Sequence, residues 1–201
     1  MPGKIILSTA YLPPLEYFAS IRDSDEIYIE REENYIKQTY RNRCYILSAG
    51  GRQLLTVPVY AGSFHKTPVK EIRIDYSKRW QQVHSGALIS AYNSSPYFQF
   101  YFDMIERIIQ KNHHFLLDLN MELLGAVLIM LRTERKISFT SEFSPADKSK
   151  EDLRYRISPK IKSCYSPKEY LQVFNSVHGF VSGLSIVDLL FNTGPDSICY
   201  L

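Results

Sequence analysis

The first thirty residues hold the pattern that most constrains the fold, because two short apolar runs flank a helical one. Residues 4–9 form a β-type run, Pro13 and Pro14 follow it, and residues 15–21 are mainly apolar. Proline is favoured in the first helical turn, where its missing N–H would have no partner. Residues 26–30 are expected to form a second strand. A strand, a crossover helix and another strand favour parallel pairing. We therefore expect an α/β fold with a Rossmann-like β-α-β opening, its first strand in the sheet interior and the helix packed on that strand.

The next segment predicts antiparallel structure. Residues 44–48 and 54–59 are β-rich runs separated by Ala-Gly-Gly-Arg at 49–52. Adjacent glycines supply the positive φ of tight hairpin turns, so a hairpin is expected. A further short strand is expected at residues 71–74, after a polar loop at 60–70 of the kind that often carries function. The sheet is therefore expected to be mixed.

The middle of the chain reads as helical from residue 77 to about 133, in three pieces. Ser95 followed by Pro96 is typical of an N-cap with proline in the first helical position. Residues 137–140 are expected to form a strand, and the polar stretch 142–151 a mobile loop.

The last helix has start and stop signals. Ser185 is a candidate N-cap, Asp188 lies three positions later as in a capping box, and Gly194-Pro195 follows. This helix is apolar nearly all round, which predicts burial.

Composition bounds the class of protein. The chain has 201 residues, 45% hydrophobic and 22% charged, as in one ordinary globular domain spanning residues 1–201. A net charge of +3 is too small to predict a nucleic-acid partner. Residues 115–131 are apolar but carry polar side chains and are short for a bilayer, so we expect a buried helix and no membrane span. Three widely spaced cysteines without a CxxC pair, and an opening unlike a signal peptide, favour a reducing, cytoplasmic location.

The strongest short catalytic motifs are absent from the sequence: Walker A, GxGxxG, HExxH and GxSxG. The turn at residues 9–14, which contains Tyr11, could still hold an anion at a helix N-terminus. The alternative is a plain strand-to-helix turn. No cofactor is indicated. His113 and His114 point apart on a helix, and no other His or Cys has ligand spacing, so zinc is not expected.

The densest polar cluster interleaves basic and aromatic side chains. Arginines offer planar donor pairs for phosphate or carboxylate, and tyrosines can stack on a sugar or base. The alternative is a solvated strand edge. Alternation within residues 152–160 suggests a strand with two arginines on one face, which could supplement the cluster. The residues are Tyr35, Lys37, Tyr40, Arg41, Asn42 and Arg43, with Arg154, Arg156 and Lys160.

Two residues are candidates for catalysis. His84 lies four positions after Trp80, so both should share one helix face. It could act as a general base, although a histidine on such a stripe is more often a packed structural residue. Asp188 could serve as acid, base or magnesium ligand, but its position is also explained by capping.

Four segments carry a resemblance to a known family, in order and over nearly the whole chain. The chain resembles the WbqC-like family, which implies a bacterial protein associated with surface-polysaccharide (O-antigen or capsule) biosynthesis. Family members often have Gln-Pro-Tyr after the first strand, where this chain has Ser8-Thr9-Ala10. The segments are Asn-Tyr-Ile-Lys-Gln-Thr-Tyr-Arg-Asn-Arg at 34–43, Leu-Thr-Val-Pro-Val at 55–59, Ser-Ala-Tyr-Asn-Ser-Ser-Pro-Tyr-Phe at 90–98 and Leu-Ser-Ile-Val-Asp-Leu-Leu at 184–190.

The leading hypothesis is an enzyme, such as a transferase, of polysaccharide or amino-sugar biosynthesis that binds a phosphorylated substrate such as a nucleotide-sugar. Lys37, Asn42, Arg43 and Arg154 would hold the anionic group, with Tyr11, Tyr40 and His84 nearby. The alternative is a non-catalytic partner-binding protein of a biosynthetic complex, using its 15 tyrosines at an interface. A binder of single-stranded nucleic acid is the third reading. A homo-oligomer is compatible with all three.

Overall fold

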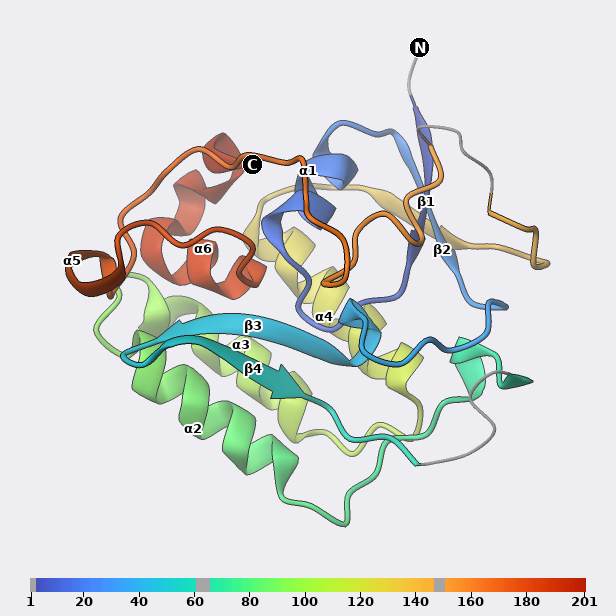
Figure 1. The fold of residues 1–201 in the computed structure, drawn as a ribbon, viewed down its shortest axis with the longest axis horizontal. Coiled ribbons are helices and arrows are strands. Elements are labelled where there is room, and N and C mark those ends of the chain that lie inside the picture. The colour runs from blue at the N-terminus through green and yellow to red at the C-terminus, as the bar shows by residue number, and fades with distance from the viewer. Residues whose placement is uncertain (1–2, 61–65, 147–150) are drawn as a thin grey trace.

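The fold is built on a three-stranded parallel sheet with the order β1-β2-β5. A computed structural model describes residues 3–60, 66–146 and 151–201. The strands are β1 (Lys4–Ser8), β2 (Glu26–Glu30) and β5 (Lys136–Phe139). Helix α1 (Leu15–Arg22) joins the first two strands, and Lys4 pairs with Glu26 in parallel register. The α/β class and the parallel opening are confirmed (Figure 1).

The position expected for β1 was wrong, because β2 is the central strand and β1 lies at an edge. Some of the backbone hydrogen-bonding groups on the outer edge of β1 pair with a later segment of the chain. The amide of Ile6 donates to Glu151 O at 2.9 Å, and the amide of Leu153 donates to Ile6 O at 2.9 Å. A single bridge at Asp152 thus covers the edge of β1 without a fourth strand.

The hairpin comprises β3 (Arg43–Ser48) and β4 (Gly51–Thr56), which pair antiparallel. Gly51 has φ 98°, as the tight turn requires. This hairpin is a sheet of its own, so the parallel and antiparallel pairs occupy two sheets and not one mixed sheet. The strand expected at residues 71–74 was wrong. The short helix η3 (Val69–Glu71) stands there, followed by isolated bridges at Arg73 and Ile74.

The three helical pieces are confirmed as α2 (Trp80–Tyr92), α3 (Phe98–Gln110) and α4 (Leu116–Met130). Ser95 does not cap α3, because its hydroxyl donates to Tyr92 O at 2.6 Å and so closes α2. The expected burial of α4 is confirmed on most of its residues. Within the described ranges, no helix has both the length and the hydropathy needed to cross a bilayer.

The C-terminal part contains α5 (Asn175–His178), α6 (Ile186–Thr193) and η4 (Gly194–Tyr200). Burial of α6 is confirmed, and Ser185 Oγ accepts from the amide of Val187, as expected of an N-cap. The capping-box role of Asp188 was wrong. Its carboxylate is fully buried and accepts from the Tyr170 hydroxyl at 2.6 Å and from Gln172 Nε2 at 2.9 Å. Because α6 is packed all round, this side chain meets interior donors.

Two expectations concern the chain between β5 and α5. The loop expected at residues 142–151 includes 147–150, which lie outside the described residues. The strand expected at residues 152–160 was wrong, since Asp152 makes one bridge and a turn follows. Arg154 and Arg156 therefore do not share a strand face: Arg154 is buried and Arg156 is exposed.

Candidate functional site

An open cleft of about 380 Å³ lies beside the first turn of α1. We call it the Tyr40 cleft. The chain reaches it at Pro14, after the loop that follows β1, and ligands commonly bind near the carboxyl ends of strands in open α/β sheets. Figure 1 shows the segment that follows residue 155, in orange, passing in front of α1. The lining residues that matter chemically are Glu16, Tyr40, Arg52, Lys160, Lys162 and Tyr165.

Basic side chains outnumber acidic ones in the lining. Arg52 comes from β4, whereas Lys160 and Lys162 come from the irregular segment before α5. Arg52 is held in place, since Nη2 donates to Gly183 O at 2.9 Å and the guanidinium lies 3.9 Å from the Tyr45 ring centroid. Together with the positive end of the α1 dipole, these charges favour an anionic ligand.

Two tyrosines give the cleft aromatic surface. Tyr40, from η1 (Tyr40–Asn42), packs edge-on against Tyr45 with ring centroids 6.4 Å apart. Burial raises the pKa of Tyr40, although Arg52 opposes this shift. The Tyr165 hydroxyl is buried and has no hydrogen-bond partner among the described residues. Burial also raises the pKa of Tyr165, so both hydroxyls are neutral donors at physiological pH.

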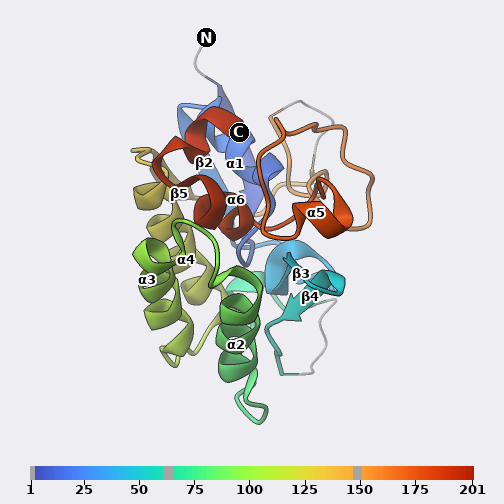
Figure 2. The same ribbon diagram turned by 90° about the vertical axis from the view of Figure 1, so that its left-hand side faces the viewer.

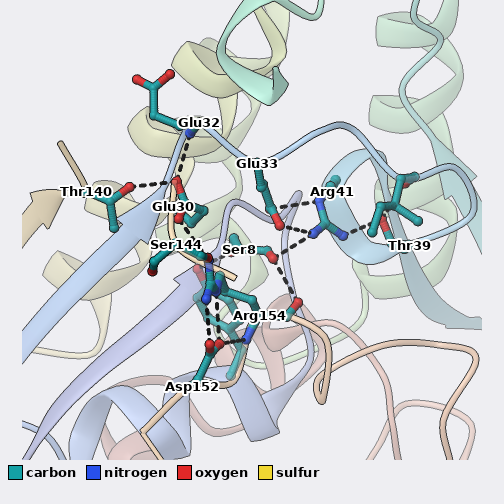
Figure 3. A network of polar contacts seen from close by, with 12 residues as sticks. Ser8, Glu30, Glu32, Glu33, Thr39, Arg41, Thr140, Ser144, Asp152 and Arg154 are labelled. Carbon is teal, nitrogen blue, oxygen red and sulfur yellow. Dashed lines mark hydrogen bonds and ion pairs between the residues drawn. The ribbon is translucent and has the colours of Figure 1, made fainter. Parts of the chain in front are cut away.

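A buried network of ion pairs (Figure 3) surrounds a second, small cavity that shares Tyr40 with the cleft. Arg41 contacts Glu33 at 2.6 Å through two hydrogen bonds. Arg154 contacts Asp152 at 2.6 Å and Glu30 at 2.9 Å. These carboxylates compensate both guanidinium groups, which are almost fully buried. The network therefore fastens the loops to the sheet and leaves little charge for a ligand.

Ser8, at the end of β1, joins the two halves of the network. Its hydroxyl accepts from Arg41 at 2.8 Å and donates to Arg154 O at 2.8 Å. A small cavity of about 10 Å³ beside it is also lined by Tyr40. That volume suits one water molecule at most.

A metal site would need several His, Cys, Asp or Glu side chains close together. Among the described residues, no group of three or more His, Cys, Asp or Glu side chains could hold a metal ion. Glu16 is the one carboxylate in the described lining of the Tyr40 cleft. The basic side chains of the lining therefore outnumber its carboxylates by three to one.

Sequence comparison now decides the family, since the profile of the WbqC-like protein family matches residues 9–165. The chain belongs to the WbqC-like family. It is also 28% identical to the uncharacterised protein Rv1507c of Mycobacterium tuberculosis, over 98% of this chain and 96% of the relative. No solved structure gives a significant match. The matched region includes Tyr40, Arg52, Lys160 and Tyr165 of the cleft.

In this WbqC-like protein, two predicted residues pair with each other away from the cleft. The Tyr11 hydroxyl lies 2.8 Å from His84 Nδ1, and both side chains are buried. His84 and Trp80 share one helix face as expected, with ring centroids 5.1 Å apart. Burial lowers the pKa of His84 to about 4, although a hydrogen bond with the Thr56 backbone acts to raise it. Neither Tyr11 nor His84 lines the Tyr40 cleft.

Asp188, the other catalytic candidate, is also enclosed and lies outside the lining of the Tyr40 cleft. Burial raises its pKa, while hydrogen bonds from Tyr170 and Gln172 oppose that change. This geometry gives Asp188 a role in holding residues 170–172 against α6.

The predicted basic cluster of the family-like segment is divided by the turn at η1. Asn42 is buried, and its Nδ2 donates to Val57 O at 2.8 Å, so it fastens the hairpin. Arg43 is half-buried in β3 and outside the cleft lining. Lys37 is exposed, and its carbonyl accepts from Lys160 Nζ at 3.1 Å. Of this cluster, Tyr40 lines the cleft and Lys37 borders it through Lys160.

Sequence reasoning missed Arg52, Lys162 and Tyr165 as site residues. Arg52 was visible only as the last residue of a hairpin turn. Lys162 ends the Lys-Ile-Lys stretch at 160–162, and Tyr165 follows three residues later. The closeness of these basic and aromatic residues was the available signal. The distance in sequence between residues 52 and 162 concealed that both line one cleft.

Proposed function

We propose that the protein binds a phosphorylated sugar compound, in particular a nucleotide-sugar, in the Tyr40 cleft. The observation that carries this proposal is the combination, in one cleft, of a helix N-terminus, three basic side chains and two tyrosines. A volume of about 380 Å³ falls in the range of small-molecule sites.

The chemistry of the lining suggests how the ligand lies. The phosphates would lie near Lys160, Lys162 and the first turn of α1, where the positive charge is greatest. The rings of Tyr40 and Tyr165 would contact the sugar or the base, since an aromatic face packs well on both.

The reaction proposed is group transfer in surface-polysaccharide or amino-sugar biosynthesis. This setting is supported by the resemblance to WbqC-like proteins, which are associated with O-antigen or capsule production. Glu16, the carboxylate in the described lining of the cleft, would accept a proton from an attacking hydroxyl or amine in such a reaction. His84 and Asp188 are not part of this proposal, because neither contacts the cleft.

The competing function is a non-catalytic partner protein that uses tyrosines as an interface. Such a surface would expose several tyrosine rings together. Among the described residues, Tyr60 is the one tyrosine in the set of strongly exposed large side chains. The cleft therefore favours ligand binding over a tyrosine interface.

A thermal-shift screen tests the proposed function. Inorganic phosphate, UDP and UDP-N-acetylglucosamine would each be added to the wild type. A ligand that binds only the folded state adds about 2.7 kcal/mol at 100 times its Kd, which shifts Tm by several degrees. The expected order is nucleotide-sugar above UDP above phosphate. No shift with any of the three would contradict the proposal.

A further inference from the structure

The outer face of α3 and α4 exposes more apolar surface than its role in the fold requires. Phe100 is 75% exposed, Ile129 68% and Met104 40%. Together they line an open groove of about 700 Å³ between the two helices. Figure 2 shows α3 and α4 at one side of the molecule, away from α5 and the hairpin. Clustered apolar side chains of this size mark interaction sites.

The groove has a hollow at its middle, where α4 has a glycine. A Cβ added to Gly125 would meet no atom within 4 Å. Glycine inside a helix costs about 1 kcal/mol relative to alanine, so its presence here has no benefit for α4 alone. The face therefore carries both a projecting ring, at Phe100, and a hollow that can receive one.

The charges on this face are self-complementary. Asp103 and Arg107 are exposed, and their spacing of four residues places them on the same side of α3. Neither belongs to an ion pair with any residue in the described ranges. By contrast, Lys111 and Glu122 on the rim pair with each other. Asp103 and Arg107 thus remain available to a partner.

We propose that a second copy of this chain covers the groove, with the two α3 helices antiparallel across a two-fold axis. An axis near the middle of α3 sets Asp103 of each copy opposite Arg107 of the other, so one contact forms twice. The apolar face continues past Ile129 into a second hollow of about 470 Å³ that reaches Ile137. Because the contact rests on the outer faces of two helices in each copy, the proposed dimer is expected to be reversible and concentration-dependent.

Charge reversal tests this pairing without disturbing the core, because both side chains are exposed. Sedimentation velocity of the wild type should show a monomer–dimer equilibrium that moves with protein concentration. Asp103→Arg alone and Arg107→Asp alone should each be monomeric, because like charges then meet across the axis. The double variant should dimerise again, and an equimolar mixture of the two single variants should form a heterodimer.

The matched control is Glu169→Arg, which reverses an exposed acidic charge outside the α3–α4 face and should leave the equilibrium unchanged. A wild type that stays monomeric at every concentration would overturn the proposal, and so would capture of a different protein by this face in its place. A dimer indifferent to both single reversals, or a double variant that fails to recover, would also overturn it.

Discussion

Arg154 shows why a basic residue of the predicted cluster need not hold a ligand. Its guanidinium bonds to Asp152, to Glu30 and to Ser144 O at 2.8 Å, within the buried network of Figure 3. Two carboxylates therefore depend on one cation for their compensation. Sequence reasoning could identify the arginine, but not its partners, because Glu30 lies 124 positions away.

Arg154→Ala is expected to destabilise the protein by about 3 to 5 kcal/mol, since it leaves buried carboxylates without a partner. Urea unfolding measures the change in free energy. Arg156→Ala, two residues on and exposed, should cost less than about 1 kcal/mol. Equal effects of the two substitutions would show that the network does not stabilise the fold.

His84 predicts a pH dependence of stability. Its pKa is about 4 when folded, because of burial, and its ordinary value is 6.5. Between these pH values the unfolded chain binds a proton that the folded chain does not. Stability should therefore fall as pH drops from about 6.5 to about 4, by about 3 kcal/mol in all. Urea unfolding at pH 7 and pH 5 would show a smaller loss for His84→Gln than for the wild type. An identical loss in both proteins would refute this assignment.

At the scale of elements, the sequence predicts those helices and strands that short-range patterns specify. The strand at residues 26–30 was placed to the residue, and the hairpin and three helices were found, because apolar periodicity and glycine turns specify them. The strands predicted at residues 71–74 and 152–160 do not form. In each segment, tertiary contacts leave only isolated bridges. The predicted site residues do not all meet in one cleft, for a related reason. Helix η1 turns neighbouring residues in different directions, so Asn42 faces the hairpin while Tyr40 faces the cleft.

The junction of α6 and η4 can be tested with two glycines of similar backbone geometry. Gly194 has φ 57° and Gly179 has φ 65°, so alanine is strained at both positions. A Cβ at Gly194 would also overlap the Tyr97 ring, whereas one at Gly179 would meet open space. Gly194→Ala should therefore destabilise more than Gly179→Ala, by about 1 to 3 kcal/mol. Thermal denaturation of both variants measures the difference, and equal losses would mean that Tyr97 does not fix this junction.

At the scale of the whole molecule, two surfaces are separated. The Tyr40 cleft is lined by α1, the hairpin and the segment before α5, whereas the apolar groove belongs to α3 and α4. Figure 2 shows the hairpin and α5 on the side opposite α3 and α4. A dimer formed through α3 would leave both clefts open, so ligand binding and dimerisation should be independent.

Titration calorimetry with UDP-N-acetylglucosamine tests the central claim most directly. The wild type should bind at one site per chain. Lys162→Glu, which replaces an exposed cation of the cleft by an anion, should weaken binding at least tenfold, about 1.4 kcal/mol. Lys78→Glu makes the same change at an exposed lysine outside the cleft and should bind like the wild type. Equal affinities for all three proteins, or no binding by the wild type, would contradict the assignment of the Tyr40 cleft as the ligand site.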